Sequence, residues 1–149
     1  IVMRPPATPA LIETSADQAA AAKLLASLPA ERVIDSTEQW NLAELPSLLA
    51  GLDCFVGVDS GVTYMADALG VAVVDFMGPA NASDQRPIGR RATVIHSDEP
   101  CAPCSHAFDA PYRCHLGTRA CIGNLQAETI ADAVVHLLAS NHNSNAERN

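Results

Sequence analysis

The sequence predicts an α/β fold in which a parallel sheet is covered by helices on both faces. Apolar runs that suit buried strands alternate with segments of helical periodicity, and this alternation is typical of parallel sheets with right-handed crossovers. The chain of 149 residues is 48% hydrophobic but only 4% aromatic and 17% charged, which favours helices packed on buried strands over disorder. One domain with a single core accounts for this length.

The predicted elements are bounded by residues that start or stop regular structure. A proline-rich connection over residues 4–9 cannot be helical, because proline lacks a backbone N–H and clashes with the preceding turn. Asn41 followed by Glu44 forms a capping box at the start of a helix. Residues 140–149 are polar and are expected to form a disordered tail after a domain that spans residues 1–139. We expect strands at 1–3, 32–35, 54–58, 72–76 and 93–96, and helices at 15–28, 41–50, 61–70 and 126–138.

Glycines and polar residues follow three of the predicted strands. Asp59-Ser60-Gly61 follows one strand, Met77-Gly78-Pro79 follows the next, and a loop follows Met3. Open α/β sheets bind ligands at the edge formed by the carboxyl ends of their strands. We therefore expect these three connections to line one edge of the sheet.

Asp59-Ser60-Gly61 joins a strand directly to a helix. Such a turn places free backbone N–H groups and the positive end of a helix dipole at the sheet edge, an arrangement that holds phosphates. Gly61 allows the backbone to approach a ligand, and Ser60 offers a hydroxyl and an amide. Asp59 repels phosphate, so it is expected to orient the turn or to accept a hydrogen bond from a sugar hydroxyl. The alternative is an ordinary Asp/Ser helix cap, which the spacing alone favours.

Two other groups of side chains also have alternative interpretations. Trp40, the only tryptophan, could stack on a base or pack as a hydrophobic staple against Leu45. The loop that contains Arg86, Arg90 and Arg91 could close over an anion, although a solvated basic loop is the commoner outcome. No Ser-His-Asp or His-Glu pattern stands out, so the sequence assigns no general base.

The charge and hydropathy of the chain exclude several classes of function. A formal net charge of −8 argues against general nucleic-acid binding and against a basic membrane-docking face. No apolar run approaches the length needed to cross a bilayer. The chain opens on Ile1 within a strand-like run, so we interpret it as a piece of a longer protein whose start says nothing of localisation.

Four of the five cysteines lie within residues 99–123, a segment without helical or strand periodicity. Cys101 and Cys104 have the Cys-x-x-Cys spacing of a metal knuckle, whereas Cys114 and Cys121 are further apart. Four thiolates would favour a tetrahedral zinc or iron site. Reduced thiols, or one or two disulfides, explain the spacing equally well, and both interpretations stay open.

Six short motifs occur in a fixed order along the chain. They are Leu42-Ala43-Glu44-Leu45, Leu49-Ala50-Gly51-Leu52-Asp53, Val58-Asp59-Ser60-Gly61, Ala66-x-Ala68-Leu69-Gly70, Gly78-Pro79 and Cys101-x-Pro-Cys104. Their ordered combination resembles glycosyltransferase family 9, the ADP-heptose:lipopolysaccharide heptosyltransferases. The resemblance covers nearly the whole chain and is strongest over residues 41–79; the combination is specific, whereas each motif alone is weak.

This resemblance implies a GT-B enzyme, whose active site lies between two Rossmann-like domains. The chain resembles most of the C-terminal, donor-binding domain. The implied reaction is inverting transfer of heptose or a related sugar from an ADP-sugar to the lipopolysaccharide core or a similar lipid-linked acceptor, without a metal or other cofactor. The implied location is the cytoplasm, peripheral at the cytoplasmic face of the bacterial inner membrane. The acceptor site, the catalytic carboxylate and a donor-binding lysine would lie outside this chain.

The resemblance also assigns donor-binding roles residue by residue. Positions in contact with the donor diphosphate and sugar match the turn from Asp59 to Val62, an adenine-side position matches Trp40, and a glutamate near the nucleoside matches Glu13. The predicted donor-binding set is Asp59, Ser60, Gly61, Val62, Tyr64, Trp40, Gly78 and Glu13.

Two residues depart from the family pattern. Tyr64 stands where the family usually has histidine, and Ala80 where it usually has threonine. One alternative is therefore a non-catalytic binding or scaffold module, in which Cys101, Cys104, Cys114 and Cys121 form a structural metal site. Another is a family member that uses a different nucleotide sugar.

Overall fold

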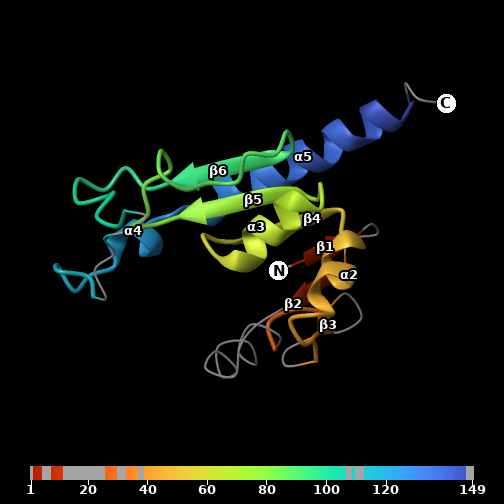
Figure 1. The fold of residues 1–149 in the computed structure, drawn as a ribbon, viewed down its shortest axis with the longest axis horizontal. Helices are drawn as coiled ribbons and strands as arrows, with labels where there is room; N and C mark the ends of the chain where they lie inside the picture. The colour runs from red at the N-terminus through yellow and green to blue at the C-terminus, as the bar shows by residue number, and fades with distance from the viewer. Residues whose placement is uncertain are drawn as a thin grey trace.

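The structure, a computed structural model, describes residues 2–4, 8–11, 26–29, 33–36, 39–106, 109 and 113–146 (Figure 1). Its elements are β1 (Val2–Arg4), β2 (Thr8–Leu11), β3 (Ile34–Asp35), α2 (Leu45–Ala50), β4 (Cys54–Val58), α3 (Gly61–Ala68), β5 (Ala72–Met77), β6 (Ala92–His96), α4 (Ala120–Gly123) and α5 (Ala127–Ala146). Across these described ranges, no helix combines the length and the apolar character that crossing a membrane requires.

The described strands form a six-stranded sheet in the order β3-β2-β1-β4-β5-β6. β4, β5 and β6 are parallel neighbours, with Cys54 beside Ala72 and Val73 beside Ala92. β2 and β3 are also parallel. The predicted α/β class is therefore confirmed, and the strand–turn–helix–strand unit from β4 to β5 lies within one or two residues of its predicted bounds.

β1 runs in the opposite direction from both of its neighbours, which corrects one expectation. Met3 lies beside Cys54, the first residue of β4, so the carboxyl end of β1 meets the amino end of β4. The loop after Met3 consequently begins at the opposite edge of the sheet from Asp59. The reason is local: Arg4 pairs with Thr8, and strands joined by so short a connection can pair only in the antiparallel sense.

Other differences from the prediction lie near the two ends of the chain. β2 begins at Thr8, inside the proline-rich connection. The helix expected at 15–28 lies almost entirely outside the described residues, which include only a turn over 26–28. At the other end α5 continues to Ala146 instead of ending near Leu138, because no glycine or proline interrupts the polar segment.

Helices cover both faces of the sheet, as the sequence predicted. Side chains alternate along β4 and β5, so neighbouring residues face opposite layers. Phe55 and Val73 pack with Leu49 of α2 and Ala66 of α3 in one buried cluster. On the other face, the buried cluster against α5 comprises Cys54, Ala72, Val74 and Val134. These two layers hold β4 and β5 in place and so fix the turn between β4 and α3.

The capping box predicted before α2 is formed. Oδ1 of Asn41 accepts hydrogen bonds from the N–H groups of Ala43 and Glu44 at 3.0 and 3.1 Å, and Oε2 of Glu44 accepts one from the N–H of Asn41 at 3.1 Å. The α-helix itself begins one turn later, at Leu45. The box therefore fixes how the chain enters α2, whose buried side chains reach the α3 face of the core.

Leu49 tests the core on the α3 face, because its side chain is fully buried there. We expect Leu49→Ala to lower the free energy of unfolding by about 2–5 kcal/mol, since lost apolar contacts leave a cavity. Urea unfolding followed by circular dichroism measures the change. Leu42 is 74% exposed, so Leu42→Ala serves as the matched control, with an expected cost below about 0.5 kcal/mol. Equal losses in the two variants would contradict this core.

Candidate functional site

The carboxyl ends of β4, β5 and β6 bring three connections to one edge of the sheet. Because these strands are parallel neighbours, the segments after Val58, Met77 and His96 leave the sheet on the same side. Adjacent strands lie about 4.8 Å apart, so the ends of β4 and β6 are separated by roughly 10 Å. The expectation that Asp59-Ser60-Gly61 and Gly78-Pro79 share an edge is confirmed.

The first turn of α3 leaves backbone donors free at this edge. Ser60 is extended, with φ −156° and ψ 163°, and its carbonyl accepts hydrogen bonds from the N–H groups of Thr63 and Tyr64. The Ser60 hydroxyl does not cap the helix; it lies 3.2 Å from the hydroxyl of Thr63. The N–H groups of Gly61 and Val62 consequently have no partner within the described part of the chain. Together with the helix dipole, they form a donor set suited to an anion.

The space beside Gly61 is open. A Cβ atom placed on Gly61 would meet no atom within 4 Å, and the residue is exposed. Packing inside this chain therefore does not require glycine here. By contrast, a Cβ on Gly57 would collide with the ring of Phe55. Gly61 thus leaves room for something other than this chain at the free amides.

Asp59 is held by two side chains from different segments. Its Oδ1 accepts a hydrogen bond from the Tyr64 hydroxyl at 2.6 Å, and its Oδ2 accepts one from Nε2 of Gln85 at 2.8 Å. Burial, followed by this hydrogen bond and the charge of Asp59, raises the pKa of Tyr64 above its usual value. The geometry supports the orienting role of Asp59. Sequence reasoning missed Gln85, because its link to Asp59 spans 26 positions without any local pattern.

The carboxyl group of Asp75 is fully buried in β5. Neither of its oxygens has a hydrogen-bond partner among the described residues. It lies between Gly57 of β4 and Val94 of β6, on the face that α3 covers. Burial, followed by the charge of Asp59, raises the pKa of Asp75 from 3.8 to about 6. Asp75 was not among the residues predicted from the sequence, although a lone carboxylate inside an apolar strand is a usable signal.

The arginine-containing loop does not bring Arg91 to the candidate site. Its Nη1 donates to the carbonyl of Gly70 at 3.0 Å and its Nη2 to that of Asp53 at 3.4 Å, both at the amino edge of the sheet. The carboxylate of Asp67 accepts hydrogen bonds from the N–H groups of Ile88 and Gly89, which fixes the loop on α3. Arg91 therefore has a structural role instead of closing over an anion.

Gly78 makes room for the cysteine-rich segment. A Cβ atom on Gly78 would collide with the side chain of Ile122 and lie 3.4 Å from the sulfur of Cys121. The same segment is joined to the loop after β5, since the N–H groups of Cys104 and Ser105 each donate to the carbonyl of Pro79 at 2.9 Å. Packing thus accounts for glycine at position 78. Because Gly78 has no side chain, its predicted contact with the donor could come only from its backbone, and that contact remains a prediction.

The four clustered cysteines are free thiols in this structure. Across the described ranges, which include all four, no three His, Cys, Asp or Glu side chains converge on a point that could hold a metal ion. Burial, followed by the charges of Cys101, Cys104 and Cys114, raises the pKa of Cys121. Backbone N–H groups, that of Arg119 first, lower the pKa of Cys114. The other three thiols thus lie near enough to act on Cys121, and the reduced-thiol and metal interpretations both remain predictions.

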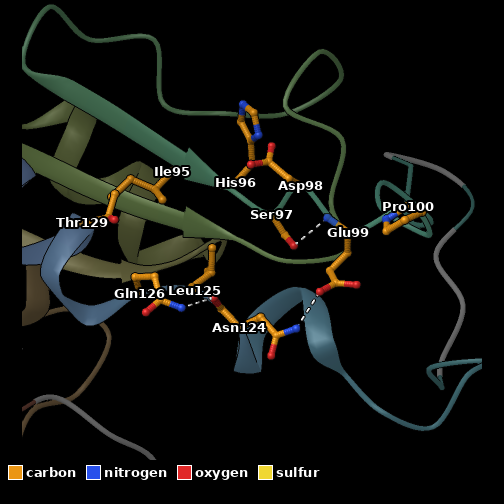
Figure 2. A pocket seen from close by; sticks show the side chains of 10 residues that line it. All are labelled: Ile95, His96, Ser97, Asp98, Glu99, Pro100, Asn124, Leu125, Gln126 and Thr129. Carbon is orange, nitrogen blue, oxygen red and sulfur yellow. Dashed lines mark hydrogen bonds between the residues drawn. The ribbon is translucent and has the colours of Figure 1, made fainter.

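A pocket of about 340 Å³ lies at the end of β6 (Figure 2). Its lining comes from residues 95–100 and from residues 124–129 at the start of α5. Glu99 accepts a hydrogen bond from Nδ2 of Asn124 at 2.6 Å, as Figure 2 shows. Asp98 and Glu99 add negative charge without any lysine or arginine in the lining. Phosphate is therefore disfavoured in this pocket. A second pocket, of about 430 Å³, is lined by Arg86 and His96 among others.

The remaining predicted donor-binding residues lie before α2. Trp40 is 40% exposed, so part of its indole is accessible to a ligand, whereas Leu45 is buried. Its stacking on a base remains a prediction. Glu13 lies outside the described residues.

The fold and this edge define an α/β domain of the Rossmann-like kind. Residues 11–113 match the family described as glycosyltransferase family 9 (heptosyltransferase). The chain belongs to glycosyltransferase family 9, and the resemblance found in its motifs is confirmed.

Two related proteins extend this finding. The chain is 34% identical over 91 residues to lipopolysaccharide heptosyltransferase 1 of Pseudomonas aeruginosa, a match that covers 61% of the chain and 25% of that protein. The structure of the present chain is similar to that of the E. coli ADP-heptose LPS heptosyltransferase II. The TM-score is 0.69 at 20% sequence identity, and the match covers 89% of the chain and 37% of that structure. The chain therefore spans a quarter of the curated relative and just over a third of the solved structure.

Asp75→Asn is expected to change the pH dependence of stability. Because the pKa of Asp75 is about 6 in the folded chain and near 3.8 when unfolded, ionising it costs the folded state about 3 kcal/mol, a cost that grows from pH 4 to pH 6. Asp75→Asn should therefore raise the free energy of unfolding at pH 7.5 by up to about 3 kcal/mol and change it little at pH 4. Urea unfolding at both values measures this, with the exposed Asp132→Asn as control. A gain that is the same at both pH values would contradict the prediction.

Gly78→Ala is expected to lower the free energy of unfolding by about 1–3 kcal/mol, because the added methyl group overpacks the contact with α4. Ile122→Ala should relieve the collision, so the double variant should be more stable than the sum of the two single changes predicts. Denaturant unfolding of the four proteins gives the coupling energy. Strict additivity would show that Ile122 does not limit the space at position 78.

Proposed function

We propose that this chain is the donor-binding domain of a glycosyltransferase that uses ADP-heptose or a related ADP-sugar. One observation carries the proposal: at the positive end of α3 the N–H groups of Gly61 and Val62 have no partner among the described residues, and the space beside the α-carbon of Gly61 is open. A diphosphate would accept hydrogen bonds from these amides and interact favourably with the helix dipole. The names of the two relatives, both heptosyltransferases, support the choice of donor.

The surrounding residues would act mainly by positioning. Asp59, held by Tyr64 and Gln85, fixes the turn so that the free amides point out of the sheet edge. Ser60 has a hydroxyl that shares only one weak hydrogen bond with Thr63 and could reorient toward the ligand. The exposed face of Trp40 would stack on adenine. Glu13 is proposed to lie near the nucleoside.

The reaction we propose is inverting transfer of the sugar to the lipopolysaccharide core or a similar lipid-linked acceptor, without a metal ion. The acceptor and the catalytic carboxylate would be supplied by a part of the enzyme outside this chain. Because the acceptor is lipid-linked, we propose a cytoplasmic enzyme that works peripherally at the inner membrane. The chain matches only a quarter to just over a third of the length of its relatives, which supports placing the acceptor site and the catalytic carboxylate in another part of the enzyme.

Gly61→Leu in the full-length protein is the direct test. The larger side chain fills the space beside the free amides, so we expect the affinity for ADP, measured by calorimetry, to fall at least roughly tenfold. Folding should be little affected, because no side chain or backbone atom of the described residues, apart from the adjoining residues of the helix itself, lies within 4 Å of the new Cβ. Gly123→Leu is the matched control, since Gly123 is also helical with open space beside it but lies in α4.

Unchanged ADP affinity in Gly61→Leu would remove the site assignment. A loss of affinity in both variants would point to a general disturbance instead of a local one. A panel of nucleotide sugars assayed with the full-length enzyme then identifies the donor, and preference for a donor other than an ADP-sugar would overturn that part of the proposal.

A further inference from the structure

Asp75 is the one feature near the candidate site that the proposed function leaves unexplained. Its side chain is 0% exposed, and both carboxylate oxygens lack hydrogen-bond partners in the described part of the chain. Buried carboxylates are almost always paired or hydrogen-bonded, because removing a bare charge from water is costly. A carboxyl group kept in this state calls for a reason beyond packing.

The register places Asp75 beneath the first turn of α3. Asp75 lies beside Gly57 in the β4–β5 pairing. A Cβ on Gly57 would come within 3.3 Å of Oγ1 of Thr63, so the first turn of α3 sits directly on this part of the sheet. Thr63 itself is fully buried and follows Gly61 by two residues. The buried carboxyl is therefore close to the amides proposed to bind the diphosphate.

The charge that acts on Asp75 is negative, and basic side chains on neighbouring elements, Arg86 and His96, line a pocket together with Val94. Asp59 at the end of β4 is the charged group that acts on Asp75, and Tyr64 on α3 is a titratable neighbour that experiences its charge. Val94, its neighbour on β6, is apolar. The guanidinium of Arg91 is held at the opposite edge by Gly70 and Asp53.

We propose that Asp75 sets the affinity of the α3 N-terminus for its anionic donor, and that it takes up a proton when the donor binds. This inference rests on the proposed donor site. The physical reason is that two phosphate charges placed above a buried, unpaired carboxylate repel it, and in a poorly solvated site that repulsion is relieved by protonation.

The direction of the pH dependence follows from linkage. In the empty protein the pKa of Asp75 is about 6, and a bound diphosphate would raise it further. Well below pH 6 the carboxyl is protonated in both states, so affinity does not vary through this group. Above pH 6 binding requires proton uptake, and affinity falls as pH rises until the carboxyl is ionised in both states. A rise of about one to two units in the pKa of Asp75 on binding corresponds to a loss of affinity of roughly tenfold between pH 6 and pH 8.

Calorimetry of the full-length protein with ADP-heptose tests the proposal. A nucleotide sugar is used because the terminal phosphate of ADP itself titrates near pH 6. We expect the Kd to rise roughly tenfold from pH 6 to pH 8, and titrations at pH 7 in two buffers of different ionisation enthalpy to show a fraction of a proton taken up per donor bound. This second measurement needs no substitution.

Asp75→Asn should remove both effects and bind the donor at pH 8 about as tightly as the wild type does at pH 6. Asp132→Asn, which removes a negative charge from the exposed side of α5, should keep the wild-type pH dependence. Donor binding without pH dependence or proton uptake would overturn this inference and leave the donor site standing, and a pH dependence that persists in Asp75→Asn would overturn it as well. Absence of binding at every pH would overturn the donor site and the inference together.

Discussion

The parallel pairing of β4 with β5 is the constraint on which the rest of the structure depends. It places the carboxyl ends of both strands at one edge, and α3 starts from that edge and packs Ala66 into the core on one face of the pair. The amides of Gly61 and Val62 are free because they begin a helix that the Ser60 hydroxyl does not cap, and the strand pairing places them at this edge. The same pairing sets Asp75 beside Gly57 and thus beneath the turn.

Electrostatics at this edge combine a favourable element with an unfavourable one. The end of α3 attracts negative charge, while Asp59 and Asp75 oppose it. Hydrogen bonds from Tyr64 and Gln85 stabilise the charge of Asp59. The carboxylate oxygens of Asp75 accept no hydrogen bond from the described residues. The pocket at the end of β6 is also acidic in its lining. The first turn of α3 therefore suits phosphate, whereas the acidic pocket at the end of β6 does not.

The sequence predicted those parts of the fold that depend on local patterns. β4, α3 and β5 were found to within a residue or two, because an apolar run, a helix start and a terminal glycine lie within 24 residues of one another. The direction of β1 was missed, since nothing within Val2–Arg4 says which strand it will pair with. The contacts of Gln85 with Asp59 and of Ile122 with Gly78 were missed for the same reason. Asp75 was visible in the sequence, but its isolation became apparent only once its neighbours were known.

Gly61 differs from Gly57 and Gly78 in the space beside its α-carbon, which no side chain of the described residues occupies. At Gly57 and Gly78 the space that a side chain would need is occupied by Phe55 and Ile122. A larger residue at either position would destabilise the fold, and the cell would degrade more of the protein. At Gly61 the volume belongs to solvent or ligand, and a larger residue would leave abundance in the cell unchanged. A survey of variants that scores only expression would therefore classify this position as tolerant, even where a substitution blocks the proposed donor site.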